Sequence, residues 1–177
     1  SRILSYNNHE RGVIRAMRLQ GATTLELGNW STSNEYFHQA LVRARKANFM
    51  EEELASLIGL SELKRRQGDL KSAREYLDDT WEAAERGPFR LQQADAFNTL
   101  AQIERDAGND TAAVEAATTA YRHSWCDGPP YAYHWGLEAA KAHLSALNAP
   151  EPIMPAFDPS KYEPMPEVEI DPHDKYH

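Results

Sequence analysis

The chain has 177 residues, of which 41% are hydrophobic and 26% are charged, and its formal net charge is −8. This length is enough for one domain with a sizeable core, and no apolar run approaches the roughly 18–20 residues that span a bilayer. The acidic balance argues against nucleic acid or an anionic membrane as the main partner.

Residues 8–147 have the composition and the spacing of helices throughout. Ala, Leu, Glu, Arg and Gln dominate, and no sustained two-residue alternation of the kind typical of strands occurs. Apolar residues recur at intervals of three and four, as in Phe37, Ala40, Leu41 and Ala44, which indicates one buried stripe on each helix. We predict seven helices, at residues 8–27, 30–47, 50–67, 70–86, 89–107, 110–124 and 131–147.

A glycine followed by Asn or Asp separates helices at three points, forty residues apart: Gly28–Asn29, Gly68–Asp69 and Gly108–Asn109. Glycine just past a helix can adopt the left-handed backbone that closes the last turn. Asn and Asp are strong N-caps, because the side-chain oxygen accepts from free amides of the next helix. One helix therefore ends where the next begins, and we expect each such pair to be antiparallel.

The composition changes after Asn148. Residues 150–177 contain seven of the ten prolines, and their seven acids and two lysines give a charge of −5, against −3 for residues 1–149. Proline opposes helix, so we predict an extended or turn-rich tail. Apolar residues such as Ile153, Phe157 and Ile170 occur along it, and we expect it to dock on the helices. Because the chain begins at Ser1 rather than at Met, we also expect it to be part of a longer protein.

Helix pairs with small and large apolar residues at fixed places around Gly–Asp or Gly–Asn resemble tetratricopeptide (TPR) repeats. The second pair carries the match in Leu57, Leu60, Gly68–Asp69–Leu70, Ala73 and Leu77; the third in Phe97, Leu100, Gly108–Asn109, Ala113, Ala117 and Ala120; the first in Gly21, Gly28–Asn29–Trp30, Phe37 and Ala40. The period departs from the family, at 40 residues rather than about 34. Long repeats of this kind, and the stretch WCDGPPYAYHWGLEAAKAHL, look like those in C-terminal regions of bacterial multidomain STAND-type signalling ATPases.

The resemblance implies an all-α, right-handed α-solenoid over residues 1–149. It would contain three TPR-like hairpins (about 8–47, 50–86 and 89–124) and a capping helix (131–147), followed by the Pro-rich acidic tail (150–177). It also implies that the first helix of each pair lines a concave groove that binds a protein segment. The expected groove residues are Arg15, Arg18, Glu62, Arg65, Arg66, Asn98, Gln102 and Arg105.

Arg65 and Arg105 lie one period apart, so they should occupy equivalent places in adjacent repeats. Guanidinium groups pair with carboxylates in bidentate fashion, so such a ladder would suit an acidic partner or the chain's own acidic tail. The alternative is a solvated charged face without a ligand. The family's clamp for a C-terminal carboxylate uses a set of Lys and Asn residues that this chain lacks, and we do not carry that activity over.

Candidate catalytic residues are few. Cys126 is the single cysteine, which excludes an internal disulfide and favours a reducing, cytoplasmic compartment. Its neighbours His123 and His134 supply no positioned base by sequence proximity alone, and together with His143 they match no usual zinc-ligand spacing. No nucleotide-binding GxxxxGK[ST] motif occurs. We therefore expect neither catalysis nor a metal or other cofactor.

Trp125, Tyr131, Tyr133 and Trp135 cluster near the last connection. They could seal the end of the solenoid or form a ligand shelf, and we favour sealing. The leading functional hypothesis is a non-catalytic scaffold that binds a protein or peptide in its groove, as the sensor or partner-binding part of a larger bacterial signalling protein. The alternative is a module that self-associates through its solenoid ends.

Overall fold

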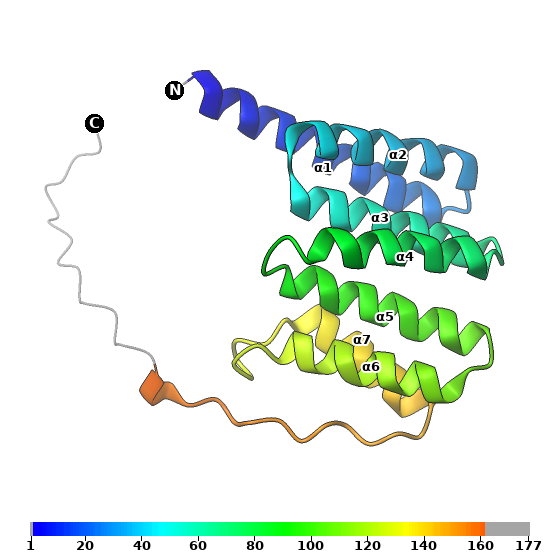
Figure 1. The fold of residues 1–177 in the computed structure, drawn as a ribbon, viewed down its shortest axis with the longest axis vertical. Helices are drawn as coiled ribbons and strands as arrows, with labels where there is room; N and C mark the ends of the chain where they lie inside the picture. Colours follow the sequence, from blue (N-terminus) through cyan, green and yellow to red (C-terminus); the bar gives the residue numbers. More distant parts are fainter. Residues whose placement is uncertain (1, 162–177) are drawn as a thin grey trace, which may run out of the picture.

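The computed structural model describes residues 2–161, with side chains from residue 9 onward (Figure 1). Seven α-helices and one short 3-10 helix account for the regular structure, and no strand occurs within that range, so the all-α prediction is confirmed. The elements are α1 (Arg2–Glu26), α2 (Trp30–Ala47), α3 (Met50–Arg66), α4 (Leu70–Ala84), α5 (Arg90–Asp106), α6 (Asp110–Trp125), α7 (His134–Ala146) and η1 (Pro159–Lys161).

Two helix boundaries differ clearly from the predicted ones. Helix α1 begins at Arg2 rather than at residue 8, and α7 begins at His134 rather than at residue 131. The late start of α7 has a local cause, because the backbone amides before it form hydrogen bonds within the α6–α7 connection and with the end of α6. The Tyr131 amide donates to the Gly128 carbonyl (2.8 Å) and the Tyr133 amide donates to the Ser124 carbonyl (2.7 Å).

The three Gly–Asn or Gly–Asp positions each reverse the chain. Gly28, Gly68 and Gly108 have φ of 75°, 79° and 75°, the left-handed region that glycine adopts without strain. The residue after each glycine donates its amide to a carbonyl five residues back, as from Asn29 to Thr24 (2.8 Å). This bond closes the last turn of the preceding helix, which explains the abrupt turn into the next one.

The expected side-chain caps form at only one of these turns. Asp69 accepts from the Ser72 amide (3.0 Å), and the side chain of Ser72, followed by this amide, lowers the pKa of Asp69. Asn29 and Asn109 occupy the N-cap positions of α2 and α6 but make no side-chain capping bond. The Asn109 amide group instead donates to Glu104 at the end of α5 (2.8 Å), so the capping prediction was wrong for both asparagines.

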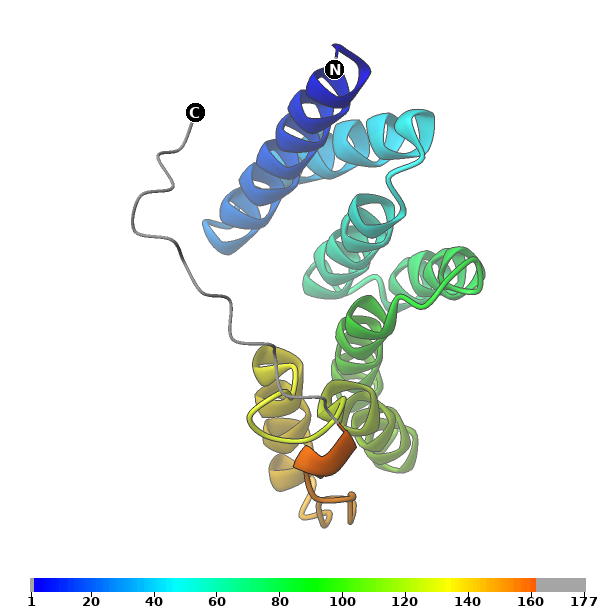
Figure 2. The ribbon, with the colours of Figure 1, turned by 90° about the vertical axis from the view of Figure 1, so that its left-hand side faces the viewer.

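The helices form two rows. Helices α1 and α2, α3 and α4, and α5 and α6 pack as antiparallel hairpins, and α7 packs on α5 and α6. Figure 2 shows α1, α3, α5 and α7 along one side and α2, α4 and α6 along the other. Helices of the first row contact one another in succession, whereas those of the second row, all within the described range, do not. We call the side formed by α1, α3, α5 and α7 the inner face.

The first row is closely packed around the ring of Phe37, which reaches from α2 between α1 and α3. A Cβ atom on Gly21 would lie 3.0 Å from the Phe37 ring, and one on Gly59 would lie 2.3 Å from it. Phe37 itself is 2% exposed. These two glycines therefore admit the aromatic ring that fills the junction between the first two hairpins.

Small residues also let the two helices of a hairpin approach each other. The Ser33 hydroxyl donates to the Gly21 carbonyl (2.8 Å) in the first hairpin, and the Ser61 hydroxyl donates to the Ala73 carbonyl (2.8 Å) in the second. The positions are equivalent, since Gly21 and Ser61, like Ser33 and Ala73, lie forty residues apart. Both hydroxyls are buried and hydrogen-bonded, so the close contact leaves no unpaired polar group there.

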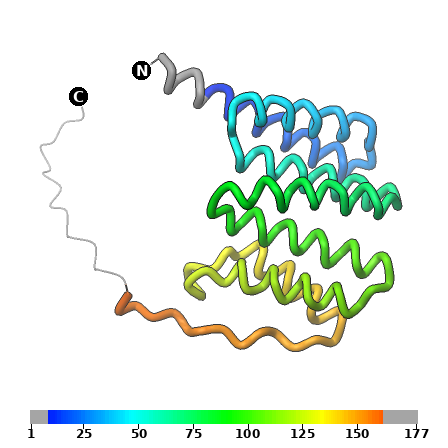
Figure 3. Tube along the Cα trace, viewed as in Figure 1, coloured from blue at the N-terminus to red at the C-terminus, as the bar shows by residue number. Residues whose placement is uncertain are grey.

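The chain after α7 turns back past α6 (Figure 3). Ala149 and Met154 pack against the core cluster of α5, α6 and α7. The Tyr121 hydroxyl donates to Glu151 (2.9 Å) and the Trp125 indole donates to the Pro155 carbonyl (2.9 Å). Residues 149–157 thus cover part of the last hairpin. The rest of the tail for which we predicted docking, residues 162–177, lies outside the described residues. None of the described helices combines the length and the apolar character that a bilayer crossing requires.

Candidate functional site

A pocket of about 320 Å³ opens on the inner face where α1, α3 and α5 meet. Ala22, Leu25, Phe37, Ile58 and Gly59 contribute its apolar part. The remaining lining residues are Arg18, Glu26, Ala55, Glu62, Gln92, Asp95 and Thr99. The volume lies at the lower end of the range for small-ligand sites, about 300–1,000 Å³, and it suits one or two side chains of a bound segment.

Two of the predicted groove arginines converge on one acid at one end of the pocket. Arg15 (3.2 Å) and Arg18 (3.0 Å) both donate to Glu52 at the start of α3. Glu52 is 3% exposed, so its charge depends on these partners rather than on water. Both arginines therefore form ion pairs within the chain, and these pairs link α1 to α3.

A continuous chain of charges joins three helices at the opposite end of the pocket. Glu26 of α1 accepts from Arg66 of α3 (2.5 Å), and Glu62 accepts from both Arg66 and Arg65 (2.7 Å each). Arg65 also pairs with Asp106 of α5. Arg65 and Arg66 are thus interleaved with three carboxylates, so both arginines are paired within the face.

The electrostatics of this chain favour its ionised form. Burial opposes ionisation of Glu62, but the hydrogen bonds from Arg65 and Arg66 outweigh it and lower the pKa of Glu62. The hydrogen bond to Glu62 is likewise the main reason that the pKa of Arg65 is raised. Glu62 and Arg65 are therefore held toward their charged forms, and the pairing of Arg65 with Asp106 links the second and third hairpins.

The other predicted groove residues lie on α5, toward α7. Asn98 is 8% exposed; its amide donates to the Gly136 carbonyl (2.9 Å), and its Oδ1 has no hydrogen-bond partner among the described residues. Gln102 donates to Asp106 (2.8 Å), and Arg105 lies 3.2 Å from Nδ1 of His143. Asn98 therefore serves the contact between α5 and α7 more than an open groove.

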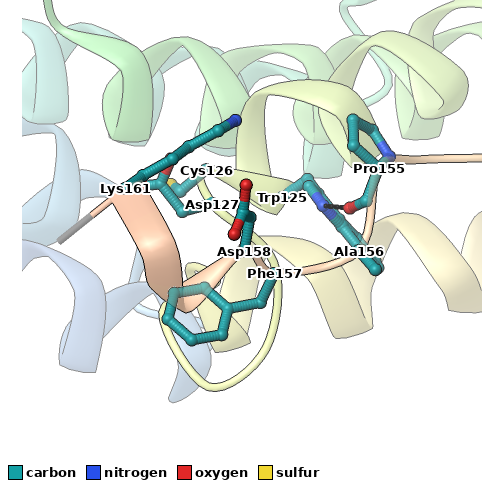
Figure 4. A pocket seen from close by; sticks show the side chains of 8 residues that line it. All are labelled: Trp125, Cys126, Asp127, Pro155, Ala156, Phe157, Asp158 and Lys161. Atoms are coloured by element: carbon teal, nitrogen blue, oxygen red, sulfur yellow. Dashed lines mark hydrogen bonds between the residues drawn. The ribbon is translucent and has the colours of Figure 1, made fainter.

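Cys126 lines a different and smaller cavity, of about 80 Å³, between the α6–α7 connection and residues 155–161 (Figure 4). Its thiol contacts the backbone carbonyl of His123 (3.7 Å). The His123 ring stacks on Phe97 instead (5.5 Å between centroids), and burial lowers the pKa of this histidine. The described geometry gives the thiol no imidazole base, which a cysteine nucleophile needs.

The metal hypothesis finds no support in the described part of the chain, where no three His, Cys, Asp or Glu side chains converge. His143 faces Arg105, and burial is the first cause that lowers its pKa. Both His123 and His143 are thus held toward their neutral forms by burial, as in histidines that pack in a core.

The four aromatic residues near the last connection separate by role. Trp125 and Tyr131 contact the chain beyond α7, Tyr131 through the Phe157 ring at 5.1 Å. The Tyr133 hydroxyl donates to Asp95 of α5 (3.0 and 3.2 Å). Trp135 is 76% exposed, so it seals nothing within the described chain.

Several residues of the pocket were not among the predicted ones, namely Glu26 and Asp95 with the apolar Ala22, Leu25 and Ile58, and neither was Glu52, the partner of Arg18. The 40-residue period contained the signal for some of them. Glu26, Arg66 and Asp106 share one position of the repeat and alternate in sign, and the structure pairs them directly or through Arg65. Reading that column for charge, rather than for arginine alone, would have indicated that carboxylates lie beside Arg65 and Arg66.

Comparison with known proteins adds no family assignment, because no family model, no curated protein and no solved structure gave a significant match.

Proposed function

We propose that the chain is a non-catalytic protein-interaction module that binds an extended protein segment on its inner face. The observation that carries this proposal is the pocket on that face, which three successive first helices build together. Its apolar floor lies between two groups of ion pairs, so a ligand could bury an anchor side chain between fixed charges. This combination of an apolar anchor site and a polar rim is typical of interaction surfaces.

The architecture that we propose is a right-handed α-solenoid of long TPR-like repeats. Three hairpins with turns forty residues apart and a first row in continuous contact support it. We further propose that α7 and the segment after it act as the terminal cap, since they cover the apolar side of the last hairpin. By the resemblance, the module would belong to a larger bacterial signalling protein and work in the cytoplasm.

The proposed mechanism is recognition by a preformed surface. The Glu52 pairs and the chain from Glu26 to Asp106 hold α1, α3 and α5 in fixed register. Because these helices need not be ordered on binding, less conformational entropy is lost when a segment docks. Affinity would then come from apolar anchors in the pocket, and the charges around it would set orientation.

Filling the pocket tests the proposal. Ala55 lines it and is partly exposed, so Ala55→Trp would occupy the space that an anchor needs. We expect peptides selected by the wild type from a random-peptide display library to lose binding to this variant at least tenfold. Ala112→Trp, at a partly exposed position on α6, is the matched control and should bind as the wild type does. Equal binding by all three proteins would refute an inner-face site.

A second candidate function, self-association, has a specific observation in its favour. Four large apolar side chains of the first hairpin are 42–77% exposed, namely Leu19, Leu27, Trp30 and Val42. This hairpin ends the row opposite the segment 149–157, so another copy could stack on it. Light scattering decides: a molar mass that stays monomeric across a wide concentration range excludes the candidate, whereas a dimer abolished by Val42→Glu supports it.

A further inference from the structure

Asp95 is the charged lining residue of the pocket that forms no salt bridge within the described chain, although the charge of Arg18 acts on it across the pocket. It lies on α5, half-buried, and both of its carboxylate oxygens lie within hydrogen-bond distance of the single Tyr133 hydroxyl donor. No lysine or arginine nitrogen of the described chain forms a salt bridge with it. Burial raises the pKa of Asp95, and the hydrogen bond from Tyr133 and the charge of Arg18 offset this effect only in part.

The other charges of the pocket are already balanced. Arg18 pairs with Glu52, Glu26 pairs with Arg66, and Glu62 pairs with Arg65 and Arg66. A ligand that offered a carboxylate would compete with these pairs, and drawing Arg18 away from Glu52 would take one of two partners from a buried acid, which is costly. A ligand that offered a cation would break none of them and would neutralise Asp95.

The apolar floor of the pocket further limits the kind of side chain that a ligand could place there. Ala22, Leu25 and Ile58 line the same pocket as Asp95. Lysine and arginine have aliphatic stems that pack along apolar surface while the charged head reaches a polar partner. A basic side chain can therefore fill the pocket with its stem and place its head at Asp95, which neither an acidic nor a purely apolar side chain can do.

Resting on the proposed function, we propose that the segment bound on the inner face carries a lysine or arginine flanked by apolar residues, whose cationic head pairs with Asp95. This reverses the expectation of an acidic partner. It also argues against the chain's own acidic tail as the occupant, because residues 162–177 hold five acids and one lysine.

The test uses the random-peptide display library on the full chain, with synthetic twins of each selected peptide. We expect the selected sequences to be enriched in Lys or Arg next to Leu, Ile, Met or Phe. Replacing the basic residue by norleucine, which keeps the stem and removes the charge, should weaken binding at least tenfold in fluorescence anisotropy. Asp95→Asn should abolish that tenfold preference, while Asp78→Asn, an exposed control on α4, should retain it.

Each other outcome overturns a defined part of the argument. Peptides that lose binding to Ala55→Trp but are acidic, or that tolerate norleucine, contradict the role of Asp95 and leave the proposed function standing. If removing residues 162–177 raises the affinity for the peptides, the tail competes for the pocket. That result also contradicts the proposal. A library that yields no peptide, or only peptides indifferent to Ala55→Trp, contradicts the proposed function and this inference with it.

Discussion

Substituting Gly59 by alanine tests the close packing of the Phe37 ring against α3. The added Cβ would lie 2.3, 2.6 and 2.8 Å from three carbons of the Phe37 ring. These distances are well inside van der Waals contact, and the ring is buried between α1 and α3, with little room to move. Either the ring or the helix must shift, and both shifts disturb the junction that forms the pocket floor.

The expected magnitude follows from two opposing effects. Overpacking a close-packed core costs about 1–3 kcal/mol, and replacing glycine by alanine inside a helix recovers about 0.5–1 kcal/mol. We therefore expect Gly59→Ala to lower the free energy of unfolding by about 1–2 kcal/mol. For a chain of this size, each kcal/mol corresponds to a fall in Tm of about 2–4 °C.

Chemical denaturation followed by far-UV circular dichroism measures the effect. Gly12→Ala is the matched control, because Gly12 is also inside a helix and its Cβ would meet no atom within 4 Å. This control should stabilise the protein by about 0.5–1 kcal/mol. Combining Gly59→Ala with Phe37→Leu should cost less than the sum of the two single changes. If Gly59→Ala stabilises the protein as Gly12→Ala does, the close approach around Phe37 does not exist.

Three further predictions concern charge. In a double-mutant cycle, Arg65→Ala and Asp106→Ala should show a coupling of about 1 kcal/mol that weakens with added salt. Burial and the bond to Glu151 raise the pKa of Tyr121 to about 12, so Glu151→Gln should lower it in an ultraviolet titration. The pKa of Asp95 is raised in the folded protein. Its contribution to the free energy of unfolding is therefore greatest below the pKa of the unfolded chain, and it is lost as pH rises through the pKa of the folded protein. Asp95→Asn should therefore gain stability over the wild type as pH rises from acid toward neutral.

Each of these has an outcome that contradicts it. The exposed pair Lys71–Glu75, at 3.8 Å, provides the reference for the coupling; an Arg65–Asp106 coupling no larger than that one would mean that the chain of charges does not hold the hairpins together. An unchanged Tyr121 titration in Glu151→Gln would place the segment after α7 away from α6. A pH-independent difference between Asp95→Asn and the wild type would show that Asp95 is not desolvated.

The turn positions were accessible from the sequence because the physics there is local. Glycine at Gly28, Gly68 and Gly108 tolerates positive φ, and forty-residue spacing makes the three turns one pattern. The side-chain caps were less predictable, since Asn109 had a competing acceptor in Glu104 on the preceding helix. Which of two nearby partners an amide chooses depends on the packed geometry, not on the residue type.

The inner face was predictable in its helices but not in the pairing of its charges. The first helices of the hairpins do line the pocket, and Arg18 and Glu62 are part of it. The sequence does not show that Glu52 is buried beneath Arg15 and Arg18, or that Tyr133, 38 residues away, reaches Asp95. Such contacts depend on how far one helix is displaced along its neighbour. The repeat period alone fixes this displacement only to within about one helical turn.

The alternation of Glu26, Arg66 and Asp106 along one column makes the three hairpins non-interchangeable. Duplicating the middle hairpin would place Arg66 next to its own copy, and deleting it would bring the two acids into apposition. Growth or loss of a single unit, the usual way in which such arrays change length, is thus opposed here by like-charge repulsion. The sign of the charge at this one position, negative, positive and negative in turn, therefore favours the present order of the three hairpins.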